Sequence, residues 1–310
     1  MDNLTHSLFG VLLSKAGLEK LTPYATPLCV VAANAPDLDV VSGLDPATYL
    51  IWHRHATHGF AAIPVMAAVA VALTLAGARI LARMRGRKVV TFPLRQAWLV
   101  ALLPAASHPL LDWTNSYGLR PWLPFSGEWT SLDLFFIIDF YVWGILLAGA
   151  IGAFFWRRRA VLVVGIALTA FAGYVGLSAH WHWQALEAVG RIDVNATRTA
   201  AWPAPWTPFL WVGWAEVDGR DVWVPIDVRN PDLSLAEFHD RSEMLALVDR
   251  AWQTKLGRAY RQFVRFPLVR VAGNEVTLSD FRFFRFGRVG FGCNIAFDEA
   301  GSVVMERFEF

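Results

Sequence analysis

Long apolar runs dominate the first 180 positions of the chain. Residues 59–78 and 160–179 are two runs of 20 residues without a charged side chain, and about 20 apolar residues suffice for a helix to cross a bilayer. A third run, residues 134–156, contains Asp139, and a fourth, residues 96–111, is shorter and contains two prolines. The pattern predicts a mainly α fold: a polytopic membrane domain with about four transmembrane helices, plus short N-terminal helices.

The beginning of the chain is interpreted differently. Residues 22–35 are apolar but too short to span, which is typical of a core helix or a re-entrant segment. The first ten residues have neither the basic start nor the cleavage site of a secretory signal peptide, so we expect none.

Residues 181–310 show shorter periods. Apolar and polar residues alternate over 211–228 around Asp218-Gly219, which predicts a hairpin. Residues 235–264 have helical spacing, with Leu245, Val248, Trp252 and Leu256 on one stripe. Alternation returns over 281–310, with a turn near 299–301. We therefore expect a smaller α+β domain after the membrane domain.

Composition supports this division. Of the 310 residues, 55% are hydrophobic and 17% are charged, whereas soluble domains contain about 25% charged residues. Residues 1–180 hold 22 charged side chains and residues 181–310 hold 32. We expect a membrane-embedded domain over 1–180 and a soluble domain over 181–310. The net charge of +2 suggests no nucleic-acid partner, and the oligomeric state stays unassigned. Cys29 and Cys293 are expected to be buried thiols.

The basic loops predict an orientation. Six Lys and Arg side chains lie within residues 79–95 and three within 157–159, and short basic loops stay in the cytoplasm. Residues 1–58, 113–133 and 181–310 then face the outside, which is the periplasm at a bacterial inner membrane. The alternative is a soluble helical protein with solvated basic loops.

The histidines cluster in the first 112 residues. His108 and Asp112 are four apart, so a helix places imidazole and carboxylate on one face, within reach of one cation. Pro109 fits if it starts a helical turn. The alternative is a structural His–Asp hydrogen bond.

Two other polar segments precede the first span. His53-Arg-His-Ala-Thr-His58 stands immediately before it, and Arg54 suits an anionic substrate such as a phosphate. Pro36-Asp-Leu-Asp39 offers two carboxylates in a turn. The alternatives are a polar interfacial segment and a solvated turn.

The predicted orientation brings these groups to one depth. Residue 58 begins an inward span and residues 108–112 end an outward one, so the groups share the outer face with Asp133. His and carboxylate ligands suit zinc or a related divalent metal, and their number allows one to three ions. The predicted metal ligands are His6, Asp37, Asp39, His53, His58, His108 and Asp112.

Five segments together resemble the YdjM-like family of membrane-bound, predicted metal-dependent hydrolases. They are residues 2–10 (DNLTHSLFG), 36–39 (PDLD), 53–54 with 57–59 (HR, THG), 108–118 (HPLLDWTNSYG) and 132–139 (LDLFFIID). The resemblance covers about residues 1–180 and implies a distant similarity to zinc-dependent phospholipase C enzymes and single-strand nucleases. The last 130 residues lie outside it.

The resemblance implies a ligand set. Asp37 or Asp39, His53 or His58, His108 and Asp112 share one ion, and His6 joins Asp112 on a second. The sequence departs from the family pattern at His55, where a small residue is more common, and at Gly59, where Ser is common. His180 and His182, at the outer end of the last span, are interpreted as interfacial histidines.

The resulting hypothesis is a membrane-bound metal-dependent hydrolase acting on a phosphoester or lipid-linked substrate at the outer face. Asp133, Asp139 or the second carboxylate of residues 36–39 orients ligands or acts as general base, and Arg54 holds the anionic group. One alternative is a metal or proton transporter, in which polar residues run through the depth of several spans. Another is a non-catalytic membrane protein with a structural metal in a closed ligand shell.

Overall fold

The chain forms two compact units. The computed structural model describes residues 1–310 apart from 44, 91–92, 241–245, 286–287 and 310. The first unit contains Met1–Asp39 and Arg54–His180, and the second contains Val40–His53 and Trp181–Phe310. Val40–His53 therefore belongs with the C-terminal part, although the sequence placed it in the 1–180 domain.

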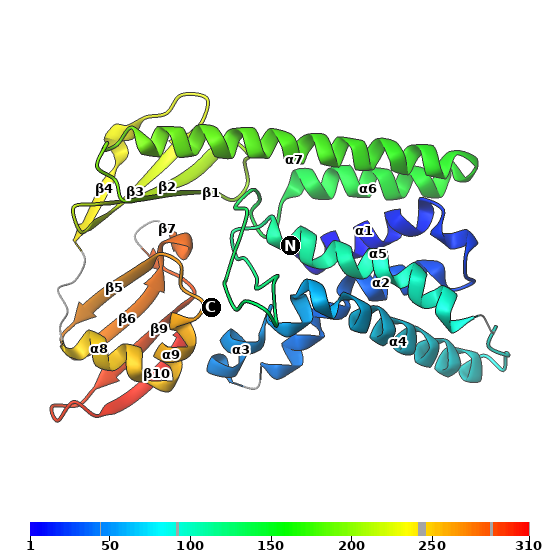
Figure 1. Ribbon diagram of the computed structural model, residues 1–310, viewed down its shortest axis with the longest axis horizontal. Coiled ribbons are helices and arrows are strands. Elements are labelled where there is room, and N and C mark those ends of the chain that lie inside the picture. Colours follow the sequence, from blue (N-terminus) through cyan, green and yellow to red (C-terminus); the bar gives the residue numbers. More distant parts are fainter. Residues whose placement is uncertain (44, 91–92, 241–245, 286–287, 310) are drawn as a thin grey trace. The chain divides into compact units, whose positions relative to one another are not determined.

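The first unit is helical (Figure 1). Its α-helices are α1 (Asn3–Lys15), α2 (Ala25–Asn34), α4 (Ile63–Met84), α5 (Leu94–Trp113), α6 (Phe140–Phe155) and α7 (Ala160–Gly190), the last of which continues into the second unit. Short 3-10 helices lie at Leu18–Lys20, Ala35–Ser42, Ala56–His58, Phe60–Ala62 and Arg157–Arg159.

Two helical segments are long and apolar enough to cross a membrane. They are Phe60–Met84 and Arg157–Gly190, and only 22% and 17% of their most apolar windows are buried. Large side chains such as Leu73 and Ile166 face outward, whereas a core helix of a soluble protein would bury them. The first and last of the predicted spans are therefore helices with lipid-compatible surfaces.

The two other predicted spans differ from expectation. α6 is apolar but has 16 residues, because the Asp139 carboxylate caps it by accepting the backbone N–H groups of Tyr141 and Val142. α5 has 20 residues but contains Pro104 and Pro109 in its interior. Pro109 thus does not start a helical turn. Among the described residues, two helices rather than four qualify as membrane spans.

α2 lies at the centre of the first unit. Its Leu28, Cys29 and Ala32 are fully buried and pack with small residues of α4 and α5. Gly10 allows α1 to approach closely, because a Cβ atom there would lie 2.7 Å from the Cys29 carbonyl oxygen. Residues 22–35 therefore contain a core helix, one of the two interpretations that the sequence allowed.

The second unit combines two antiparallel sheets with short helices. One sheet has the order β1-β2-β3-β4 and the other β10-β9-β6-β5, and Trp202, Trp214 and Phe266 belong to a core that joins them. The strands are β1 (Arg198–Pro203), β2 (Leu210–Val217), β3 (Arg220–Asp227), β4 (Glu237–Asp240), β5 (Pro267–Ala272), β6 (Glu275–Asp280), β7 (Phe284–Arg285), β8 (Arg288–Val289), β9 (Gly292–Phe297) and β10 (Val303–Glu309). The helices are α3 (Pro46–Trp52), α8 (Ala246–Gln253) and α9 (Lys255–Arg261).

Most of the predicted C-terminal pattern is confirmed. β2 and β3 form the hairpin around Asp218-Gly219, and β9 and β10 pair across the turn near Gly301. The continuous helix expected over 235–264 is wrong: β4 occupies its beginning, and Thr254 starts α9 after α8 has ended. Leu245 lies outside the described residues.

Candidate metal centre

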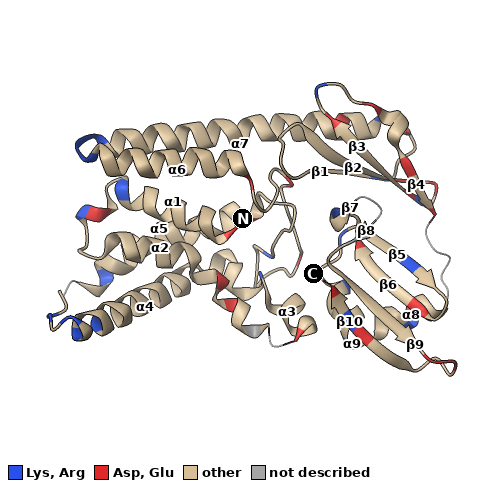
Figure 2. Cartoon of the chain, turned by 180° about the vertical axis from the view of Figure 1, so that it is seen from behind, with Lys and Arg blue, Asp and Glu red and all other residues tan. Residues whose placement is uncertain are grey.

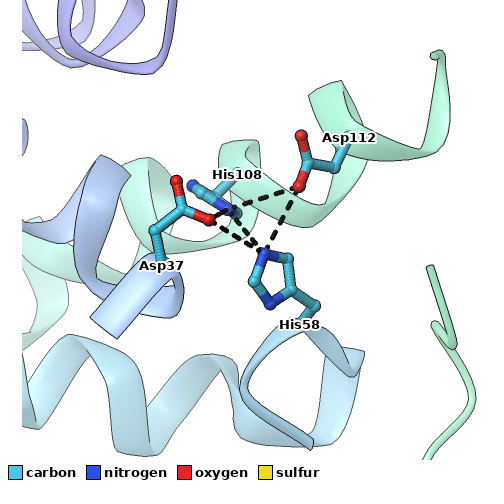
Figure 3. Close-up of side chains that lie close together, drawn as sticks. All are labelled: Asp37, His58, His108 and Asp112. Atoms are coloured by element: carbon cyan, nitrogen blue, oxygen red, sulfur yellow. Dashed lines mark hydrogen bonds and ion pairs between the residues drawn. The ribbon is translucent and has the colours of Figure 1, made fainter. Parts of the chain in front are cut away.

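Four side chains from three segments of the first unit converge on one point. They are Asp37, His58, His108 and Asp112 (Figure 3). Each offers one ligand atom, and the four atoms lie within 4.8 Å of one another. Such a group could hold a metal ion.

Local structure explains how each side chain arrives there. His108 and Asp112 lie one turn apart on α5, so their side chains share a face, with Nε2 and Oδ2 3.5 Å apart. Asp37 is in the 3-10 helix that continues α2, and His58 ends the short 3-10 helix before the first span. The His–Asp pair that the sequence predicted on one helical face is confirmed.

The spacing of the ligand atoms suits a small cation. His58 Nε2 lies 3.3 Å from Asp37 Oδ1 and 3.3 Å from Asp112 Oδ2, and 3.0 Å from His108 Nε2. His108 Nε2 lies 3.5 Å from the same Asp37 oxygen. Four ligands tetrahedrally arranged about 2.0–2.2 Å from a metal ion are about 3.3–3.6 Å from one another.

Hydrogen bonds behind the rings fix both imidazoles. His108 Nδ1–H donates to the Ala33 carbonyl oxygen at 2.7 Å, and His58 Nδ1 lies 3.2 Å from Asp39 Oδ2. Thr57 Oγ1 donates to the same Asp39 oxygen at 2.9 Å. With Nδ1 of both rings turned outward, both Nε2 atoms face the point where the carboxylates meet.

The cluster requires a cation. His58, His108 and Asp112 are fully buried, and the Asp37 side chain is 15% exposed. Asp112 Oδ2 lies 3.3 Å from His58 Nε2 and 3.5 Å from His108 Nε2, and it receives a hydrogen bond only from a ring that carries a proton on Nε2. A buried carboxylate oxygen without a donor or a cation is costly. Two ring nitrogens 3.0 Å apart also cannot both present lone pairs unless a positive charge lies between them. A proton on His58 or a metal ion supplies it, and the donor set fits a metal.

The pKa values reflect this need for positive charge. Burial opposes the charged form of His58, but hydrogen bonds with Asp112, Asp37 and Asp39 outweigh it and raise the pKa of His58 to about 10. Burial also opposes the Asp37 carboxylate, yet hydrogen bonds from His108 and His58 hold the pKa of Asp37 well below its usual range. In the absence of metal, the proton on His58 therefore neutralises part of the buried negative charge.

The other oxygen of Asp112 faces a different set of groups. Arg54 Nη2 lies 3.2 Å from Asp112 Oδ1 and His6 Nε2 lies 3.3 Å from it, and the amino group of Met1 forms an ion pair with it. Burial lowers the pKa of His6 to about 3, so the ring is neutral. Asp112 thus presents one oxygen to the four-ligand cluster and the other to nitrogen groups.

Arg54 is held in an uncommon conformation. Its φ is 55°, in the left-handed region that costs an L-residue about 1–2 kcal/mol. Its backbone N–H donates to Asp39 Oδ2 at 2.9 Å, and its Nη1 donates to Asn115 Oδ1 at 3.1 Å. These hydrogen bonds and the ion pair with Asp112 offset the strain. They also link residues 39, 54 and 112 in one network.

Several predicted site residues lie outside the four-ligand group. Asp39 lies next to His58 Nδ1, on the side of the ring that faces away from the four-ligand group. His53 directly follows α3 in the second unit, and its ring stacks on Tyr49. Asp139 caps α6 and accepts a hydrogen bond from Tyr174 Oη at 3.0 Å. The Asp133 carboxylate accepts one from Ser131 Oγ at 2.9 Å. Catalytic roles for Asp133, Asp139 and Arg54 stay predictions.

The remaining histidines are also outside the group. His55 is only partly buried, and burial followed by the charge of Arg120 lowers its pKa. His180 is exposed near the end of the first unit. In the second unit, His182 stacks on Trp211 and its Nε2 lies 3.1 Å from the Ala201 carbonyl oxygen.

Sequence reasoning gave no role to two residues of this network. Asn115 is fully buried and contacts Arg54 and Asp112, and Thr57 contacts Asp39 and His58. Asn115 follows Asp112 by three positions, and Thr57 directly precedes His58. A polar residue beside a ligand in an apolar region was the available signal.

Comparison with known proteins identifies one family. The model of the YdjM inner membrane protein family matches residues 1–183, which include all four ligands of the cluster. No curated protein and no solved structure matches the chain.

Proposed function

The chain belongs to the YdjM inner membrane protein family, and we propose that its first unit is a metal-dependent hydrolase for a phosphoester or lipid-linked substrate. The observation that carries the proposal is the buried cluster of Asp37, His58, His108 and Asp112. Two imidazole nitrogens and two carboxylate oxygens at nearly tetrahedral spacing suit zinc. A bound zinc ion would supply Lewis acidity and a water of lowered pKa.

The residues of the chain prepare this site. The Ala33 carbonyl and Asp39 orient His108 and His58, and such partners also increase the basicity of the ligating nitrogen. Arg54 is engaged with Asp112 and Asn115. We therefore assign it to positioning Asp112, in place of the substrate contact that the sequence suggested.

A second ion between His6 and Asp112 fits this geometry poorly. A second ion shared by His6 and Asp112 would have to approach Asp112 Oδ1, where the Arg54 guanidinium already carries positive charge. A guanidinium and a divalent ion beside one oxygen repel each other strongly in a buried site.

Access to the site comes from the Asp37 side. Its side chain is the only one of the four with any exposure, so water and substrate would reach the ion past it. The basic residues at the opposite end of the first unit favour a cytoplasmic location for that end. The metal site would then face the periplasm at membrane depth, where lipid-linked phosphoesters are accessible.

One specific observation favours a second candidate function. Structural zinc sites are closed by four protein ligands, whereas catalytic ones keep a position for water. The cluster has four protein ligands, three of them fully buried. A non-catalytic protein with a structural metal is therefore the competing proposal. A transporter is less well supported, since the buried polar side chain of α4, Thr74, donates to the Ala70 carbonyl within its own helix.

The test joins metal content with hydrolysis. We would purify wild type, the double variant His108→Ala/Asp112→Ala and the control His55→Ala in detergent without chelators. Elemental analysis should give about one zinc per chain for wild type and the control and none for the double variant. Phosphomonoester, phosphodiester and phospholipid substrates would then be assayed before and after metal removal.

The outcomes separate the candidates. Hydrolysis that requires the metal and is lost in the double variant supports the enzyme. A tightly held metal that stabilises the fold, without hydrolysis of any phosphoester class, supports the structural site. Absence of metal from wild type, even with zinc supplied, would falsify both.

A further inference from the structure

The first unit has a second charged region, remote from the metal site along the helices. Figure 2 shows Lys and Arg gathered at one end, where α4 and α6 finish and α5 and α7 begin. The basic residues of these segments are exposed apart from Lys15, which is partly buried. They are Lys15, Lys20, Arg79, Arg83, Arg85, Arg87, Lys88, Arg95, Arg157, Arg158 and Arg159.

A groove of about 580 Å³ runs between α4 and α5 at this end. Most of its lining is apolar, and two arginines complete it. The lining residues are Ala68, Val71, Ala72, Leu75, Arg79, Leu94, Arg95 and Trp98. Trp98 is fixed, because its Nε1–H donates to the Pro64 carbonyl oxygen at 2.9 Å. The groove thus has a firm apolar wall and a cationic end.

Arg79 and Arg95 line the groove from its two different helices. α4 and α5 run antiparallel (Figure 1), and helical side chains lean toward the N-terminus of their own helix. By this rule the Cβ atoms of Arg79, near the end of α4, and of Arg95, at the start of α5, lean in opposite directions along the groove. Among the described residues, no carboxylate forms an ion pair with either arginine.

Another hollow of the first unit contains a carboxylate that pairs with its basic side chain, which the described lining of the α4–α5 groove does not. It measures about 340 Å³ and lies between α1 and the α6–α7 connection. There Glu19 sits 2.5 Å from Lys15 Nζ and compensates its charge. In the α4–α5 groove the positive charge stays uncompensated beside an apolar surface, on a helix that is a candidate membrane span.

We propose that the α4–α5 groove binds one anionic phospholipid, with an acyl chain along Ala68, Ala72 and Trp98 and the phosphate held by Arg79 and Arg95. Arginine matches phosphate through charge-assisted hydrogen bonds, and basic pockets between membrane helices are suited to anionic headgroups. The groove contains no residue of the metal centre, so this lipid is a separate ligand from any substrate there.

The test measures which lipid stays with the protein. Wild type would be reconstituted with equal amounts of phosphatidylglycerol and phosphatidylcholine, and the ratio of the two lipids in the singly lipid-bound protein read by native mass spectrometry. Wild type should retain phosphatidylglycerol preferentially, and Arg79→Gln/Arg95→Gln should lower that preference by about tenfold or more.

Two further variants make the result specific. Arg83→Gln/Arg87→Gln removes the same charge from the same end without touching the groove lining, and it should retain the wild-type preference. Ala72→Trp keeps both arginines but fills the groove, and it should lose the bound lipid. Metal content and elution volume report whether each variant is folded.

Other outcomes overturn the proposal. An equal loss of the phosphatidylglycerol preference in the Arg79/Arg95 and Arg83/Arg87 variants would mean that the lipid is attracted by the basic surface in general. Retention by Ala72→Trp would mean that the headgroup alone is bound, and a dimer that Ala72→Trp disrupts would mean that a second copy fills the groove. Equal retention of both lipids by wild type would also exclude the site.

Discussion

At one end of the helical unit the charged groups are buried and paired, and at the other they are exposed. Asp112 is fully buried and contacts Arg54 and five further groups, whereas the arginines at the end of α4 are exposed. Buried charges must be matched because desolvation is expensive. Exposed ones keep their hydration and interact weakly.

The difference teaches how one small helical unit divides its charged residues. The acidic and imidazole groups are concentrated where burial gives them a strong demand for a cation. The basic groups are exposed at the other end, where they keep their hydration at little structural cost; under the two proposals above they would set the orientation and attract anionic headgroups. This difference between the two ends can be tested by making the same chemical change at each.

The largest contrast is expected from replacing a carboxylate by an amide at each end. Asp112→Asn leaves Arg54 buried without its counter-charge, so the free energy of unfolding of the metal-free protein should fall by about 3–5 kcal/mol. Glu19→Gln breaks the partly exposed ion pair with Lys15 and should lower the free energy of unfolding by less than about 1 kcal/mol. Denaturant titration in detergent measures both, and equal effects would contradict the contrast.

A smaller effect, on metal affinity, is expected from changing Asp39, which orients the His58 ring. Asp39→Asn keeps the volume of the side chain but weakens its interaction with His58 Nδ1. Metal affinity should fall by about 10–100-fold, as for other groups that orient metal ligands. Competition with a chromophoric chelator gives the dissociation constant. Asp45→Asn, a change of the same kind in the second unit, is the control and should leave it unchanged.

The smallest effect, taken per pH unit, is expected from pH. The pKa of His58 is raised from 6.5 to about 10 in the metal-free fold. Its protonation therefore contributes stability fully below pH 6.5, and this contribution is lost as pH rises through about 10. Metal must displace that proton, so metal affinity should rise by up to about tenfold per pH unit across this window. The affinity measured at several pH values checks this, and a flat profile would show that His58 is neutral or not a ligand.

Local signals in the sequence predicted much of this structure. The charge-free runs gave helices α4 and α7, and Asp218-Gly219 gave the β2–β3 hairpin. The spacing of His108 and Asp112 gave one shared face, because four residues make about one helical turn. Each of these depends on near neighbours in the chain.

Other predictions failed where distant or competing interactions prevailed. The run 134–156 gave only the 16 residues of α6, since Asp139 satisfies the first N–H groups of the helix and so fixes its start. Residues 237–240 have helical spacing, yet they pair with β3 as strand β4. Tertiary pairing overrode the local preference there.

By itself the sequence determined which residue types are present for chemistry and which stretches are helical or apolar, because these follow from composition and short-range periodicity. Only the tertiary structure decided which atoms meet. It selected Asp37 for the cluster and placed Asp39 behind His58, and it turned Arg54 toward Asp112. The ligands come from segments up to 75 residues apart, from Asp37 to Asp112. Their meeting depends on the packing of α2 against α4 and α5, which no local pattern encodes.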